Sequence, residues 1–112
     1  MDNPKYVLFT GSDDQYYFKL TAPNGQTILV SEGYTNKKNC EKGISSVRTN
    51  APEDAHYKRL DSAGGQYYFN LVASNGQVIG KSEMYQTKKS RENGIAAVKI
   101  NAIHAPTEDT TD

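Results

Sequence analysis

Apolar and polar residues alternate from Tyr16 to Ala22, which is the period of a half-buried β-strand. An aromatic and β-branched run from Tyr6 to Thr10 precedes this segment and indicates another strand. The turn residues Pro23-Asn24-Gly25 follow it and lead into a third apolar segment, Thr27 to Ser31. The pattern therefore predicts an antiparallel meander of three strands joined by short turns.

The alternation also assigns the side chains of these strands to two faces. The apolar side chains define the expected core face, which comprises Tyr16, Phe18, Leu20 and Ala22, together with Ile28 and Val30 of the third strand. The opposite face of the second strand carries Tyr17, Lys19 and Thr21. We expect this second face to be open to solvent if the helices cover only the first.

The period changes to that of a helix between Thr35 and Ala51. Apolar and small residues recur there at i, i+3, i+4, i+7 and i+11, namely Cys40, Gly43, Ile44, Val47 and Ala51. Thr35 is the expected N-cap, and Pro52 follows the expected end. Gly43 on the buried stripe predicts a continuous helix whose backbone lies too close to the sheet to admit a Cβ atom. The alternative is a helix that breaks at this glycine.

The chain repeats this whole pattern once, 51 residues later. Residues 66–102 align with residues 15–51 without a gap, and 21 of the 37 aligned positions are identical. A second set of strands and a second helix, Thr87 to Ala102, are therefore expected in the same order. In this register the segment His56 to Asp61 takes the place of the first strand.

Two copies of so small a unit are expected to share one core. A unit of about 50 residues is marginal alone, whereas the 112 residues of the whole chain suit one domain. We predict an α+β fold: a tandem repeat of three strands and a helix, one composite antiparallel sheet, and two helices packed on one face with pseudo-twofold symmetry. The repeats are expected at about 5–54 and 55–106, followed by a flexible acidic tail at 107–112.

The charges of the chain cancel, with 13 basic and 13 acidic side chains and a mean hydropathy of −0.75. Neutrality removes the global attraction expected of a general nucleic-acid binder. Cys40 is the only cysteine, so no intramolecular disulfide can form, and its place on the buried stripe indicates a small core residue. With no signal-peptide pattern and no long apolar run, we expect a cytoplasmic protein that does not enter membranes.

Three short motifs recur in both copies of the repeat. An alternating segment with an Asn-Gly turn lies at Phe18 to Ile28 and again at Phe69 to Ile79. A Ser-Glu-x-Tyr loop lies at Ser31 to Tyr34 and again at Ser82 to Tyr85. A Gly-Ile-x-x-Val-x-x-Asn-Ala helix segment lies at Gly43 to Ala51 and again at Gly94 to Ala102. In these motifs, and over nearly its whole length, the chain resembles the YegP-like family of small bacterial proteins of unknown function.

The resemblance implies a unit of three strands, a helix and a further strand, with the C-terminal strand exchanged between units. It implies that His56 to Asp61 closes the first unit and opens the second, and it brings no catalytic or binding residue. Residues Ile103 to Pro106 have a poor strand pattern. The sequence therefore leaves open whether this end of the chain supplies an exchanged strand.

Two tyrosines on the expected open face form the first candidate site. Tyr17 and Tyr68 match between the copies, and Lys19 and Asn70 lie beside them in their strands. Exposed aromatic rings on a sheet are stacking platforms for bases or sugars. The alternative is that tyrosine is a good strand former and pairs across strands without a further role.

Basic residues of the two helices form the second candidate site. Lys37 and Lys38 begin the first helix, and Lys88 and Lys89 begin the second. Each helix carries four basic side chains against one acidic side chain, which gives a net charge of +3. Such a layer could contact phosphate, and the alternative is an ordinary solvated helix surface.

Glu32 and Glu83 recur in the loops before the helices and form a third candidate, a pair of acid–base carboxylates. No histidine, cysteine or second acid recurs with them, so the alternative is that they accept local amide hydrogen bonds. His56 and His104 are isolated, and no metal-ligand spacing or cofactor motif is present. We therefore expect neither an enzyme nor a metal or cofactor.

Our leading hypothesis is a non-catalytic binding module that uses the exposed sheet face to hold a small ligand or a protein partner. The alternative is weak association with nucleic acid through the basic helix layer. Because the two repeats already form an internal pseudo-dimer, we expect a monomer.

Overall fold

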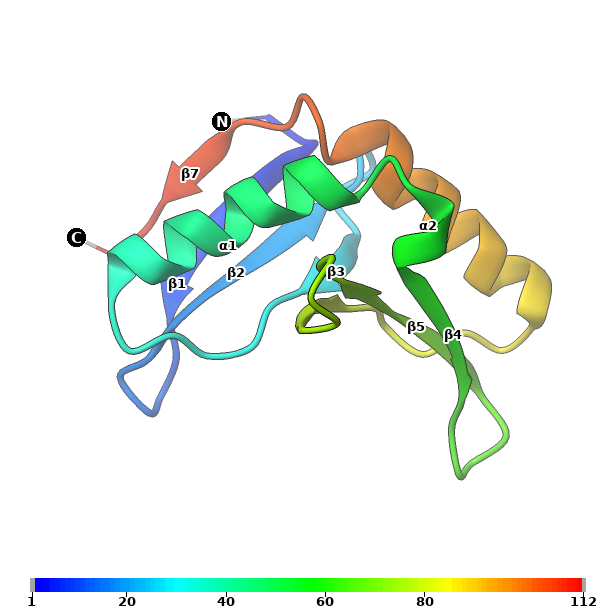
Figure 1. Ribbon diagram of the computed structural model, residues 1–112. Coiled ribbons are helices and arrows are strands. Elements are labelled where there is room, and N and C mark those ends of the chain that lie inside the picture. Colours follow the sequence, from blue (N-terminus) through cyan, green and yellow to red (C-terminus); the bar gives the residue numbers. More distant parts are fainter. Residues whose placement is uncertain (1, 112) are drawn as a thin grey trace.

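The computed structural model describes residues 2–111 and shows one twisted sheet with two helices against it (Figure 1). Along the chain the elements are β1 (Lys5–Thr10), β2 (Tyr16–Thr21), β3 (Thr27–Val30), α1 (Lys37–Asn50), the 3-10 turn η1 (Asp54–His56), β4 (Tyr57–Asp61), β5 (Tyr67–Val72), β6 (Val78–Lys81), α2 (Lys88–Asn101) and β7 (Thr107–Asp109). This order confirms the α+β class and the tandem unit of three strands and a helix.

All seven strands belong to one sheet, in the order β4-β5-β6-β3-β2-β1-β7. The two repeats meet at its centre, where β3 and β6 pair antiparallel through Val30 and Lys81. Because these residues are equivalent under the 51-residue shift, the pseudo-twofold axis passes between them. The sheet is composite, as predicted, but it is mixed rather than wholly antiparallel, because β7 runs parallel to β1.

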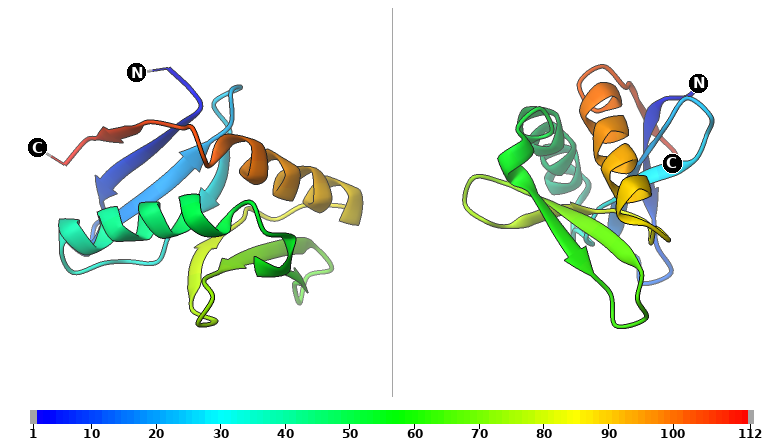
Figure 2. Two further views of the ribbon diagram at one scale, coloured as in Figure 1. Left: turned by 45° about the horizontal axis from the view of Figure 1, so that its top comes forward. Right: turned by 90° about the vertical axis from the view of Figure 1, so that its right-hand side faces the viewer.

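Both helices lie on one face of the sheet, as predicted (Figure 2). α1 packs on β1, β2, β5 and β6, and α2 packs on β3 and β5, so each helix covers strands of both repeats. One core results, and it contains Phe18 and Ile44 of the first repeat together with Phe69 and Ile95 of the second. The shared core fits the size argument, since neither repeat alone buries enough apolar surface.

The helices begin at polar caps, although the first cap is not the predicted one. Asn36, and not Thr35, caps α1: its side-chain oxygen accepts a hydrogen bond from the Asn39 N–H at 2.8 Å. The equivalent residue Thr87 caps α2 by accepting from the Ser90 N–H at 3.0 Å. Asparagine is at least as good a cap as threonine, which is why both helices begin at the same repeat position.

Both helices run without a break through their glycines. A Cβ atom at Gly43 would clash with the hydroxyl group of Tyr34 and would lie 3.0 Å from the Phe18 ring. At Gly94 it would clash with the hydroxyl group of Tyr85 in the same way. The steric reason predicted for these glycines is confirmed, and the obstacle is a tyrosine ring that lies between the helix and the sheet.

The third strand departs from the predicted alternation because of a β-bulge. The shifted register pairs Leu29 with Leu20, and both Ile28 and Leu29 are buried in the core. Val30 instead pairs with Lys19, whose side chain lies on the opposite face. The prediction that Val30 shares the core face with Ile28 was therefore wrong, since a bulge adds one residue and reverses the faces that follow it.

Leu29 fills the space that Gly80 leaves at the centre of the sheet. A Cβ atom on Gly80 would lie 2.6 Å from both Cγ and Cδ2 of Leu29. The two positions are equivalent in the repeats, so a leucine at each would compete for the same volume. The repeats have diverged here into a large and a small residue that together fill the core.

The C-terminal residues form a strand where a flexible tail was predicted at 107–112, and that prediction is wrong for Thr107–Asp109. Backbone hydrogen bonds with β1 hold this strand, and Lys5 and Lys37 add ion pairs with Glu108 (2.6 Å) and Asp109 (3.1 Å). β7 is thus the exchanged strand that the resemblance implied, since it follows the second repeat and pairs with the first. β4 opens the second repeat by pairing with β5.

Cys40 is fully buried on α1, as predicted, and burial raises the pKa of its thiol to about 11. At pH 8, we expect iodoacetamide to alkylate native Cys40 at least about 100-fold more slowly than the urea-unfolded chain, because a rise of two pKa units removes most of the thiolate. Mass spectrometry of quenched samples measures both rates. Native alkylation within tenfold of the unfolded rate would contradict this burial.

The contact between Leu29 and Gly80 predicts a specific pattern of stabilities. Gly80→Ala should lower the free energy of unfolding by about 1–3 kcal/mol, because the added Cβ overpacks the core. Leu29→Ala should cost about 2–5 kcal/mol by leaving a cavity. The double variant should cost less than the sum of the two, because the shortened Leu29 side chain makes room for the new methyl group.

Urea unfolding of the four proteins measures this coupling. Gly64→Ala is the matched control, because a Cβ atom there lies 3.9 Å from its nearest neighbour, Ser62 Oγ. It should change the stability by no more than about 0.5 kcal/mol. Additive costs for Leu29→Ala and Gly80→Ala would show that the two residues do not share this space.

Candidate functional site

The face of the sheet opposite the helices carries a row of side chains that crosses all seven strands. The ladder pairs place in this row, from β4 to β7, Lys58, Asn70, Lys81, Val30, Lys19, Val7 and Glu108. The pseudo-twofold axis passes through the middle of the row. The predicted site residues Lys19 and Asn70 therefore share one row, on either side of the axis.

The row carries a concentration of positive charge in a chain that is neutral as a whole. Lys19, Lys81 and Lys58 come from three different strands, and the side chains of Lys81 and Lys58 are exposed. The one acid of the row, Glu108, lies at its β7 end and is paired with Lys5 at 2.6 Å. The central part of the row is thus suited to attract an anionic group.

An aromatic hollow lies beside the row, at its β1–β2 end. The Tyr17 ring stacks on the Phe9 ring with centroids 5.7 Å apart and an interplanar angle of 18°. The Tyr17 hydroxyl donates to Asp13 Oδ2 at 2.6 Å, a bond that raises the pKa of Tyr17 and lowers the pKa of Asp13. With Val30 and the loop at 11–13, these rings line a shallow hollow of about 390 Å³. Its walls suit a flat apolar group.

The equivalent position in the second repeat has a different chemistry. Lys81 Nζ lies 5.0 Å from the centroid of the Tyr68 ring, in a cation–π contact. Leu60 pairs with Tyr68 where Phe9 pairs with Tyr17. The Asn70 Oδ1 atom is buried and has no hydrogen-bond partner within residues 2–111. An unsatisfied buried acceptor costs about 1–3 kcal/mol, so a donor at this atom would be stabilising.

The four residues predicted for the sheet site all belong to the open face, but they form no single cluster. Tyr17 and Tyr68 lie on opposite sides of the lysine row, because β2 and β5 run in opposite directions. Sequence reasoning missed Lys81, because the predicted alternation placed the equivalent Val30 on the core face. Lys81 itself was the available signal. The alternation would have pointed this lysine into the core, where lysine is rarely buried, and that conflict indicates a bulge.

The basic helix residues do not form one surface. α1 and α2 begin at opposite ends of the molecule (Figure 1), so Lys37 and Lys38 lie far from Lys88 and Lys89. Lys37 also makes its ion pair with Asp109. Further along the helices, Arg48 donates to the Ala105 carbonyl and Lys99 to Asp54, each at 2.8 Å, and Arg91 Nη1 donates to the Leu60 carbonyl at 3.2 Å. Internal contacts thus involve much of the expected basic layer.

Glu32 and Glu83 are exposed, and neither lines the hollow of Phe9, Tyr17 and Val30. Their loops are held by a serine hydroxyl, since Ser31 Oγ donates to the Glu32 carbonyl and Ser82 Oγ to the Glu83 carbonyl, each at 2.8 Å. The backbone of these residues, rather than the carboxylate, therefore carries the recurring contact.

Within residues 2–111, no group of three or more His, Cys, Asp or Glu side chains is placed to hold a metal ion. Neither helix combines the length and apolar character that crossing a membrane requires.

Comparison with known proteins places the chain among proteins of the same architecture. The profile of a domain of unknown function, DUF1508, matches twice, at residues 12–57 and 62–109. A UPF0339 protein of Bordetella pertussis is 53% identical over 106 residues, covering 95% of this chain and 96% of that protein. The UPF0339 protein YegP of Escherichia coli is 49% identical over 106 residues, with the same coverage.

Two solution NMR structures share the fold. That of E. coli YegP, named as a protein of unknown function, superposes with a TM-score of 0.92 at 47% identity, covering 99% of this chain and 96% of that one. That of a UPF0339 protein of Shewanella oneidensis gives a TM-score of 0.90 at 43% identity, covering 96% and 91%. The repeat, the mixed sheet and these likenesses together show that the chain belongs to the UPF0339 (YegP) family and carries its DUF1508 domain twice.

Proposed function

We propose that the chain is a non-catalytic binding module whose open sheet face holds a ligand with a flat ring and an anionic group. The observation that carries this proposal is the placement of Lys19 and Lys81 in one row beside the hollow of Phe9, Tyr17 and Val30. A nucleotide combines both chemical features. Its base would stack in the hollow, and its phosphate would lie against the lysine row.

The expected free energies of stacking and of ion pairing indicate that the aromatic ring and the lysines would both contribute to the binding affinity. Stacking of a base on an aromatic side chain contributes about 1–3 kcal/mol, whereas an exposed ion pair contributes at most about 1 kcal/mol. The ring would therefore supply most of the affinity and the lysines would select for the anion. Asp13 holds the Tyr17 hydroxyl and so fixes the ring before a ligand arrives, which lowers the entropic cost of binding.

The alternative function, nucleic-acid association through the helices, has less support from the arrangement. Its four candidate lysines divide between the two ends of the helix layer, and Lys37 is paired with Asp109. A single phosphate group cannot reach both ends. The sheet face brings its cations together in one row, whereas the helix layer does not.

Adenosine monophosphate and adenosine are suitable probes for NMR titration of the uniformly labelled protein. We expect saturable amide shifts on β1, β2, β3 and β6 with the nucleotide, and weaker binding of the nucleoside. The double variant Lys19→Ala/Lys81→Ala should weaken nucleotide binding roughly three- to tenfold, as expected for the loss of two exposed ion pairs.

The matched control is Lys88→Ala/Lys89→Ala, which removes the same charge from the start of α2. This control should leave the nucleotide affinity unchanged. Shifts confined to the helices, or a larger loss in the helix variant than in the sheet variant, would refute the sheet-face proposal and favour the helix layer.

A further inference from the structure

Two hollows related by the pseudo-twofold axis lie on the helix side of the sheet, away from the open face. Each forms between the β-hairpin turn of one repeat and the helix of the other. Their volumes are similar, about 360 and 400 Å³. These volumes fall within the range of small-molecule sites, and the positions arise only when the two repeats combine.

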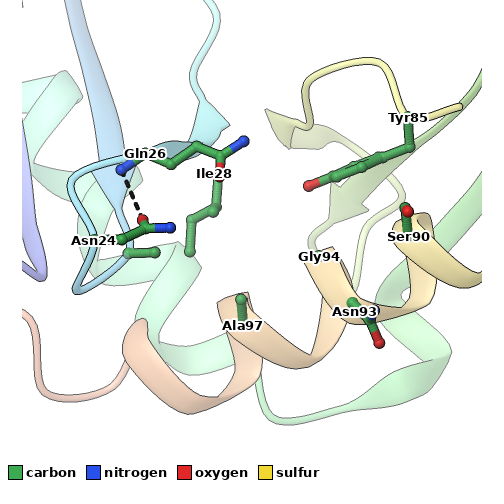
Figure 3. A pocket seen from close by; sticks show the side chains of 9 residues that line it. Asn24, Gln26, Ile28, Tyr85, Ser90, Asn93, Gly94 and Ala97 are labelled. Atoms are coloured by element: carbon green, nitrogen blue, oxygen red, sulfur yellow. Dashed lines mark hydrogen bonds between the residues drawn. The ribbon is translucent and has the colours of Figure 1, made fainter.

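The first hollow has an apolar floor and neutral polar walls (Figure 3). Ile28 and Ala97 lie at its base, Gln26 stands on the hairpin wall, and Tyr85 reaches in from the loop that precedes α2. Asn93 lies on the α2 wall. No charged residue lines this hollow.

The second hollow repeats this arrangement with one change of charge. Ile79, Gln77 and Tyr34 take the places of their equivalents, and Lys42 of α1 stands where the first hollow has Asn93. Lys42 is exposed and makes no ion pair within residues 2–111. The second hollow therefore presents a cation beside the same neutral groups.

The tyrosine hydroxyls are the donors that the two hollows offer to a ligand. Tyr34 and Tyr85 are half-buried, yet neither hydroxyl has a hydrogen-bond partner within residues 2–111. Neither hydroxyl oxygen is among the buried, unpartnered side-chain atoms of residues 2–111, so each is reachable from its hollow. Burial also raises the pKa of both groups, so each remains a proton donor at neutral pH. Two equivalent donors, each at the wall of a hollow, are suited to an acceptor supplied by a ligand.

Identical residues of the two repeats line much of each hollow. Six of the nine residues that line the first hollow are the same as their equivalents 51 positions away: Ala22, Asn24, Gln26, Ile28, Tyr85 and Gly94. In the row on the open face, by contrast, the equivalent of Lys19 is Asn70 and the equivalent of Val30 is Lys81. The two hollows thus keep most of their lining chemistry in common.

We propose that the two hollows are a pair of binding sites for small hydrogen-bonding molecules, and that the hollow with Lys42 selects a carboxylate. The tyrosine hydroxyl and the glutamine amide bind the neutral polar part of the ligand, and its apolar part rests on the isoleucine. In the hollow with Lys42 the ammonium group pairs with the carboxylate. This inference is independent of the sheet-face proposal, because the two surfaces share none of these residues.

N-acetylglycine and N-acetylglycinamide are the probes, since they differ only in a carboxylate and an amide. NMR titration should give saturable amide shifts at Gly43, Ala73 and Gln77 for the Lys42 hollow, and at Gly94, Ala22 and Gln26 for the other. The acid should bind the Lys42 hollow roughly two- to fivefold more tightly than the amide, as expected for one exposed ion pair. The other hollow should not distinguish the two probes.

Exchange of one residue between the hollows provides the control. Lys42 and Asn93 are both exposed on helices, so Lys42→Asn and Asn93→Lys should both fold. Lys42→Asn should abolish the preference for the acid, and Asn93→Lys should create it in the first hollow. Absence of saturable shifts, or a preference that does not move with the lysine, would overturn the proposal, and neither result depends on binding at the sheet face.

Discussion

The structure depends on each helix packing against a central strand of the other repeat. α1 lies on β6 and α2 lies on β3, so neither repeat closes its own core. Two hydrogen bonds also join one repeat to the other. Tyr6 donates to the Ala102 carbonyl and Tyr57 donates to the Ala51 carbonyl, each at 2.7 Å. The first strand of one repeat thereby satisfies a carbonyl at the end of the other repeat's helix. Both the open face and the paired hollows exist because each helix packs against a strand of the other repeat.

Within this symmetric frame, duplication has allowed equivalent positions to diverge in complementary ways. Gly80 leaves the volume that Leu29 occupies, so the small residue in one repeat compensates for the large residue in the other. Cys40 has diverged to Arg91, which is 8% exposed yet donates to the Leu60 carbonyl at 3.2 Å. The guanidinium remains compatible with burial because it keeps polar partners. In a strictly symmetric sequence, leucine at both positions 29 and 80 would clash, and glycine at both would leave a cavity.

Hydrophobic periodicity and the internal repeat were sufficient to predict the elements, the composite sheet and the side on which the helices pack. They were not sufficient for features that depend on pairing partners. Alternation placed Val30 in the core because a bulge leaves no clear mark in a single strand. The acidic composition of residues 107–112 predicted a tail, whereas β1, distant in sequence, pairs with β7, and Lys5 and Lys37 neutralise its acids. The hollows were missed because their walls come from different repeats.

The symmetry of each surface constrains what it can bind. A site that lies across a twofold axis and is made of unlike residues, as at Val30 and Lys81, presents one set of contacts and suits one ligand in one orientation. Sites that lie away from the axis and keep like residues, as at Tyr34 and Tyr85, suit two ligands of related chemistry. The unlike residues at the axis and the identical tyrosines away from it are therefore consistent with two separate binding surfaces, the open sheet face and the paired hollows. Packing accounts for the paired glycines and rings, and it leaves both tyrosine hydroxyls accessible to a molecule in the hollow.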